Sequence, residues 1–308
     1  MKDTSFLKYI AALILFGSNG IIASYISMTS YEIVFTRTLI GSLFLILIFF
    51  LSRQKVQAWS KKRHFLYLVT SGMAMGASFM CLFESYVQVG VCISTLAYSC
   101  GPVIVMMLSP ILFKEKMTVV KLLGFFAVVL GMVCINGYSM SQGTLSMGIF
   151  YGISAAFLYA VMVVFNKKAA SITGLENPML QLLISFVTVA VFLGLKQGLV
   201  LHLDIEDLLP ILLLGIVNTG VGCYFYFSSI GQLNVQTVAI CGYLEPLSAL
   251  VFSTMFLGEA LNSLQWLGSA LVFGGAAFGE LYGKIGQESE EVYRVPKQEQ
   301  DGQPTSVY

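Results

Sequence analysis

Charged residues are scarce in this chain of 308 residues: Asp, Glu, Lys and Arg make up 11% of it, against 57% hydrophobic residues. Soluble globular domains carry roughly 25% charged residues. The composition therefore excludes an ordinary soluble domain and predicts an all-α integral membrane protein. The net charge of +1 supplies no basic surface, so we expect no nucleic acid as a partner.

Residues that carry catalysis or bind metals are also scarce. The chain has two histidines, and it contains no phosphate-binding loop, Gly-x-Ser-x-Gly, His-Glu-x-x-His or Cys-x-x-Cys motif. Its six cysteines lie in apolar segments without metal-ligand spacing, which is typical of packing residues. These absences argue against an enzyme, a metal site, a cofactor and transport driven by ATP on this chain.

Long apolar runs, in contrast, are abundant. Crossing a hydrocarbon core of about 30 Å takes about 20 residues of helix. Ten such runs are present, near residues 6–27, 31–51, 65–86, 91–112, 119–136, 146–166, 178–195, 208–230, 235–257 and 264–283. The polar segment that follows, 285–308, is expected to be a disordered cytoplasmic tail.

The distribution of Lys and Arg predicts the orientation of these spans. Cytoplasmic loops carry an excess of basic residues. If the N-terminus lies inside, 15 of the 17 basic residues fall on the inner side. We therefore expect a multi-pass protein of the cell membrane with both termini in the cytoplasm.

The chain also contains an internal repeat. A gap-free offset of 144 residues aligns 12 identical positions over residues 76–131, including Pro102 with Pro246. We therefore expect two five-helix repeats, 1–137 and 138–284. Because five is odd, the second repeat enters the membrane from the opposite side. In such inverted-topology repeats the substrate site usually lies near the membrane midplane, often at broken helices.

Two corresponding blocks support a family resemblance. Block 102–131, in which a proline precedes Lys-Glu-Lys and a helix with spaced glycines, and its copy 245–275 resemble the EamA-type repeat of the drug/metabolite transporter superfamily. The resemblance covers residues 6–283. It implies alternating access to a central cavity lined by spans 1, 3, 4, 6, 8 and 9, and transport of amino acids, amines, sugars or other metabolites. Glu115 lacks the preceding Gly of Gly258-Glu259, so we expect it to shape a turn and assign it no transport role.

Glu245 is the strongest candidate for chemistry, because it lies next to Pro246 in the middle of the ninth expected span. A charge at the bilayer centre costs at least ~2.5 kcal/mol, and the proline removes a helical hydrogen bond. Glu245 either bonds to neighbouring groups and locks the helix, or binds a proton, an amine or a cationic substrate in turn. Its repeat equivalent is Gly101, so the expected site is asymmetric, with Pro102 and Pro246 as paired helix breaks.

Other intramembrane polar residues are weaker candidates. Arg37 and Glu84 are expected at similar depths near the outer face, where they can form a charge pair that acts as a structural lock or outer gate, or contact the substrate. Tyrosines offer a flat apolar face suited to amines through cation–π contact. The remaining candidates for lining the cavity are Asn19, Tyr98, Tyr159, Asn218 and Tyr243.

The leading hypothesis is a secondary active transporter that moves a small organic metabolite, such as an amino acid or amine, by alternating access. Coupling to protons or to another solute gradient is expected from the intramembrane carboxylate. The alternative is a membrane-embedded enzyme or a lipid-binding scaffold. The expected partners are a small-molecule substrate and the lipid bilayer, and both a monomer and a homodimer remain open.

Overall fold

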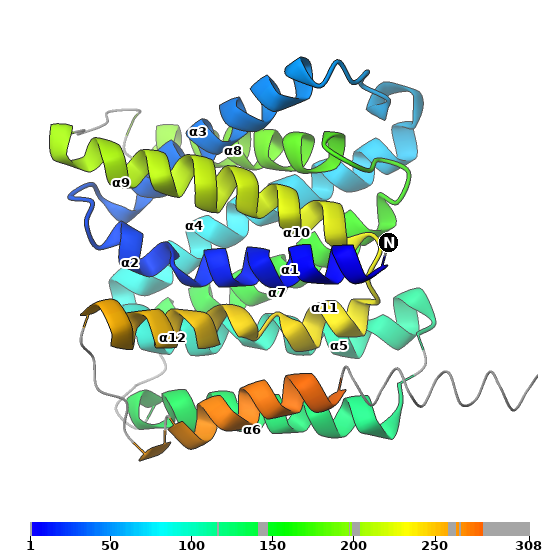
Figure 1. Cartoon of the computed structure of the whole chain (residues 1–308). Helices are drawn as coiled ribbons and strands as arrows, with labels where there is room; N and C mark the ends of the chain where they lie inside the picture. Colours follow the sequence, from blue (N-terminus) through cyan, green and yellow to red (C-terminus); the bar gives the residue numbers. More distant parts are fainter. Residues whose placement is uncertain are drawn as a thin grey trace, which may run out of the picture.

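The computed structural model describes most of the chain. The described residues are 2–115, 117–140, 147–196, 198, 204–257, 263–264 and 266–279. Every regular element within these ranges is a helix (Figure 1). The expected tail, 285–308, lies outside the described residues, as do the last residues of the tenth expected span.

The helices follow one another with short connections. In chain order they are α1 (Lys2–Gly17), α2 (Asn19–Ala23), α3 (Ser30–Leu51), α4 (Lys62–Tyr98), α5 (Cys100–Phe113), α6 (Val119–Met140), α7 (Met147–Lys168), α8 (Glu176–Lys196), α9 (Leu208–Leu212), a π-helix (Leu213–Val221), α10 (Gly222–Ile230), α11 (Val235–Cys241), α12 (Leu244–Leu257) and the helix Trp266–Gly279. Six segments are long and apolar enough to cross a membrane, and three shorter helices are also apolar. The expected multi-pass helical protein is therefore confirmed at this level.

Helix α4 has 37 residues and would be about 55 Å long if it were straight. The Ser85 hydroxyl donates to the Ser94 hydroxyl at 2.6 Å, although nine residues of straight helix would separate them by about 13 Å. The chain therefore reverses direction between these two serines, close to the boundary expected between spans 65–86 and 91–112.

Helix breaks precede both prolines that the sequence singled out. The first break separates α4 from α5 at Ser99, and the second separates α11 from α12 at Gly242 and Tyr243. Pro102 and Pro246 are each the third residue of the helix that follows. The first four N–H groups of a helix have no intrahelical acceptor, so a proline in the first turn removes no helical hydrogen bond. The prolines thus lie one turn after the breaks.

Small residues set the closest helix contact. Helix α6 packs against the helix Trp266–Gly279, and a Cβ added at Gly131 would lie only 2.6 Å from the carbonyl oxygen of Gly268. A Cβ at Gly124 would lie 2.7 Å from the carbonyl oxygen of Gly275. Absence of a side chain at these positions lets the two backbones touch, as in other membrane helix pairs.

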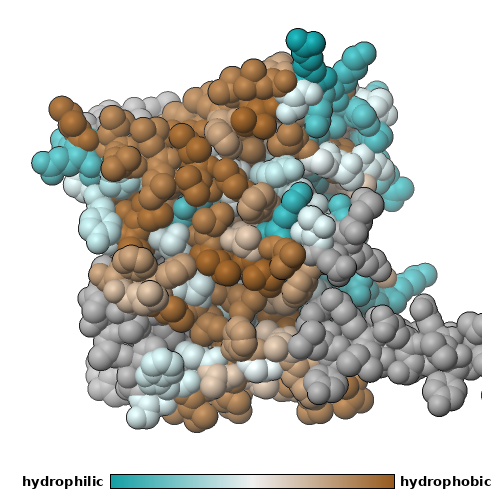
Figure 2. All heavy atoms as spheres, viewed as in Figure 1, coloured by the Kyte–Doolittle hydropathy of each residue, from teal (hydrophilic) through white to brown (hydrophobic). Residues whose placement is uncertain are grey.

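The two ends of the bundle differ in charge. At one end, which we call the basic end, α1 and α11 begin and α3, α7 and α10 end (Figure 1). Basic residues at this end include Arg53, Lys55, Lys61, Lys62, Arg63, Lys114, Lys167 and Lys168. The other end, called the opposite end, holds the connection between α2 and α3 and the end of α8. Hydrophobic residues cover most of the visible face between the ends, as expected for a surface in contact with lipid (Figure 2).

Candidate functional site

A central cavity of about 690 Å³ lies among the helices. It extends to the opposite end, where Met28, Ser30 and Val87 line it. Eight of the ten residues that the sequence singled out also line it: Asn19, Arg37, Tyr98, Pro102, Tyr159, Tyr243, Glu245 and Pro246. The cavity therefore brings together residues from helices that are far apart in the sequence.

Glu245 is the second residue of α12 and faces this cavity. Among the described residues, no side chain or backbone group forms a hydrogen bond or ion pair with its carboxylate. Pro246 has no N–H to donate to the carbonyl of Gly242 four residues earlier. That carbonyl instead accepts a hydrogen bond from the Glu245 N–H at 3.3 Å. The backbone at the break is thus satisfied by its own amides, and the Glu245 carboxylate remains available to whatever fills the cavity.

Arg37 lines the same cavity from α3 and is 7% exposed. Its Nε donates to the Thr219 hydroxyl at 3.0 Å, and its guanidinium lies 5.5 Å from the ring centroid of Phe79. Thr219 belongs to the π-helix, where its hydroxyl donates to the carbonyl of Leu214 five residues earlier at 2.8 Å. Arg37 and Glu245 therefore line the same cavity, one with a basic and the other with an acidic side chain.

Asn218 was predicted to line the cavity, but the structure buries it at 1% exposure. Its amide nitrogen lies 2.8 Å from the Leu15 carbonyl, 2.8 Å from the Ser18 hydroxyl and 3.0 Å from the Asn19 side-chain oxygen. These acceptors surround the break between α1 and α2. Asn218 therefore holds that break in place, and its neighbour Asn19 is the one that reaches the cavity.

Aromatic side chains form much of the cavity wall. The ring of Tyr98 meets that of Tyr159 edge-on with centroids 5.6 Å apart. The Tyr159 hydroxyl lies 3.3 Å from that of Tyr226, whose ring is 5.9 Å from Phe16. Tyr226 and Phe16 were not predicted, although both belong to spans expected to line the cavity and Tyr226 stands in the aromatic run 224–227. Such a wall accepts the apolar part of a solute or a cation over a ring face.

Tyr243 connects the two proline-associated breaks. Its hydroxyl donates to the carbonyl of Ser99 at 2.9 Å, and its ring is 2% exposed. Ser99 is the residue 144 positions earlier, so the hydrogen bond joins equivalent positions of the internal repeat. The break that presents Glu245 is therefore fixed to the break in the first half of the chain.

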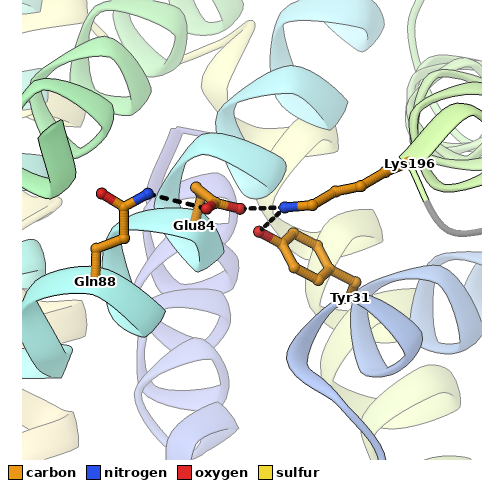
Figure 3. Close-up of polar contacts among 4 residues, drawn as sticks. All are labelled: Tyr31, Glu84, Gln88 and Lys196. Atoms are coloured by element: carbon orange, nitrogen blue, oxygen red, sulfur yellow. Dashed lines mark hydrogen bonds and ion pairs between the residues drawn. The ribbon is translucent and has the colours of Figure 1, made fainter.

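The expected pair of Arg37 with Glu84 does not form, and this prediction is wrong. Glu84 pairs with Lys196 at 2.5 Å, and it also accepts a hydrogen bond from Gln88 (Figure 3). Lys196 in turn donates to the Tyr31 hydroxyl at 2.8 Å. Helix α8 packs against both α3 and α4, which contact each other little, so it places its terminal lysine beside Glu84. Depth in the membrane alone could not reveal this neighbour.

Comparisons with known proteins give matches over most of the chain. The model of the EamA-like transporter family matches the chain twice, over residues 5–137 and 146–279. An uncharacterized transporter of Bacillus subtilis, YxxF, is 28% identical over 90% of this chain and 89% of its own length. A protein of Escherichia coli K12 named "Probable amino-acid metabolite efflux pump" is 24% identical over 74% of this chain and 78% of its own. One crystal structure shares the fold, with a TM-score of 0.78 at 16% identity, over 92% of this chain and 99% of that one.

Proposed function

Because this chain belongs to the EamA-like transporter family, we propose that it is a secondary active transporter that moves a small organic metabolite by alternating access. Homologues of the family are named as transporters, and the chain is a multi-pass membrane protein. A cavity that extends to one end of the bundle and contains an available carboxylate supports the finer mechanism.

The proposed architecture is two inverted five-helix repeats, 1–137 and 138–284, with both termini in the cytoplasm. Contacts that repeat under the offset of 144 residues support it. The contact of Arg37 with Thr219 corresponds to that of Gln181 with Met75, in which the amide nitrogen lies 3.8 Å from the sulfur. Under the same offset, the contact of Gly131 with Gly268 corresponds to that of Gly275 with Gly124. Pairs of this kind are expected when two related halves pack around a pseudo-twofold axis.

The proposed substrate carries an ammonium group, as an amino acid or an amine does. The single observation that carries this choice is the Glu245 carboxylate, which faces the cavity without a hydrogen-bond or ion-pair partner among the described residues. Tyr98 and Tyr159 flank the same space with aromatic faces suited to a cation or an apolar substituent. The printed name of the Escherichia coli relative points to the same class of solute.

Coupling follows from competition at this carboxylate. The Glu245 carboxylate can either bind a proton or pair with a substrate ammonium, so binding of one favours release of the other. Arg37 lines the same cavity and supplies a basic group there. A proton gradient can then drive the solute in the opposite direction, provided that the cavity opens to one side at a time.

The test is uptake and counterflow in proteoliposomes with a panel of amino acids and amines. We expect wild-type protein to exchange at least one solute of this class, and Glu245→Gln to lose most of that exchange. Glu206→Gln is the matched control, because Glu206 is an exposed carboxylate near the opposite end that does not line the cavity. The proposal fails if no solute moves under any gradient, or if Glu245→Gln and Glu206→Gln transport equally well.

A further inference from the structure

The cavity ends in a packed layer on the side of the basic end. Along α7 and α10, which both end at the basic end, the last lining residues are Met162 and Phe227. Beyond them lies Tyr9, which is 0% exposed, and its hydroxyl donates to the carbonyl of Val238 at 2.8 Å. Ile230 is also 0% exposed in this layer. Opening the cavity toward the basic end must therefore separate these groups.

Two charged side chains hold the turn 230–236, which connects α10 with α11 at the basic end. Lys167, at the end of α7, donates to the carbonyl of Ile230 at 3.0 Å and also to the carbonyl of Leu233. Glu115, in the connection after α5, accepts hydrogen bonds from the N–H of Val235 at 2.7 Å and from the N–H of Gln236 at 3.1 Å. The two side chains thus bind opposite ends of one turn.

The charges match the helix ends that they contact. Carbonyl groups at the end of α10 attract the Lys167 ammonium, whereas amides at the start of α11 attract the Glu115 carboxylate. Both side chains are only half-buried, but the backbone groups that they satisfy would need water if the contacts broke. If these contacts break, water must therefore enter at the basic end to hydrogen-bond the exposed backbone groups.

From this arrangement we propose that Glu115 and Lys167 form a latch on the turn 230–236 that keeps the cavity closed at the basic end. The inference rests on the proposed alternating-access function and adds residues that set which side is open. While the latch holds, α5, α7 and the α10–α11 turn remain together. When both side chains release, α11 moves away from Tyr9 and the cavity opens toward the basic end.

The internal repeat indicates that the latch is one-sided. The residue equivalent to Lys167 under the offset of 144 is Ala23, which cannot supply a cation at the opposite end. The equivalent of Glu115 is Glu259, which lies outside the described residues. The lysine contacts thus stabilise closure at the basic end without a counterpart, so the protein without substrate is expected to favour a cavity open at the opposite end.

The test uses cysteine accessibility, which requires no substrate. In full-length protein whose six native cysteines are replaced by alanine, Val238→Cys reports opening at the basic end, since Val238 is 1% exposed. Val87→Cys reports opening at the opposite end, since Val87 lines the cavity and is 67% exposed. Each reporter is labelled with a polar maleimide in detergent micelles, alone and together with Lys167→Met or Glu115→Gln.

Either latch variant is expected to speed labelling of Val238→Cys by roughly tenfold, equivalent to about 1.4 kcal/mol, and to slow labelling of Val87→Cys. Lys168→Met is the matched control, because the ammonium of Lys168 lies over the Phe165 ring, 5.7 Å from its centroid, and does not hold the turn. Unchanged labelling, or faster labelling at both positions, overturns the latch, since the second result indicates loss of folding. Opposite shifts without transport of any solute would support the latch and reject the proposed function.

Discussion

The hydrogen bond from the Tyr243 hydroxyl to the Ser99 carbonyl joins the two helix breaks beside the candidate site, so its removal should lower the stability of the protein. Tyr243→Phe removes only the hydroxyl and keeps the ring, so the buried packing is nearly unchanged. The bond is 2.9 Å long, and Ser99 lines the cavity, where water can partly replace the lost donor. We therefore expect the free energy of unfolding to fall by about 1 kcal/mol, near the middle of the range for a neutral hydrogen bond.

The measurement is equilibrium or thermal unfolding in one detergent, with Tyr25→Phe as the control. Tyr25 is 63% exposed, so removal of its hydroxyl should change stability by less than about 0.5 kcal/mol. Because Tyr243 stands two residues before Glu245, we also expect substrate affinity to weaken, by up to about fivefold if the whole loss is felt in binding. Equal stability and equal affinity of the two variants would refute a structural link between the breaks.

Three further substitutions test the packing and the charges. Gly131→Ala should destabilise the protein by about 1–3 kcal/mol by overpacking, since its Cβ would lie 2.6 Å from a carbonyl oxygen, whereas Gly274→Ala meets nothing within 4 Å; comparison of their melting temperatures checks this. Asn218→Ala should cost about 1–3 kcal/mol, measured by unfolding, because three acceptors lose a buried donor. Lys196→Met should cost less than about 1 kcal/mol in the same assay, because the lysine is 39% exposed and its pair with Glu84 is screened by water.

Much of the architecture could be predicted from the sequence, because apolar length and the position of proline act locally. Pro102 and Pro246 were singled out from the sequence, and the structure begins a new helix two residues before each. The reversal between Ser85 and Ser94 lies at the expected boundary. Each of these features depends on neighbouring residues in the chain.

The sequence-based predictions failed where the packing of helices against one another determines which side chains meet. The partner of Glu84 is Lys196, which belongs to a helix more than a hundred residues away, and hydropathy does not reveal which helix lies beside which. Asn218 lies in the π-helix, and its amide donates to acceptors around the α1–α2 break. The prediction for Asn218 rested on its polarity and expected depth, and neither of these indicates which face of the helix a residue occupies.

The most direct test of the proposed function is solute uptake into proteoliposomes driven by an imposed pH gradient, measured for wild-type protein and Glu245→Gln over a range of external pH. If Glu245 binds proton and substrate in turn, wild-type uptake should be concentrative and depend on pH. Glu245→Gln should lose the response to the gradient while remaining folded by size-exclusion chromatography. Gradient-driven uptake by Glu245→Gln with the same pH dependence as wild-type protein would contradict the role of this carboxylate.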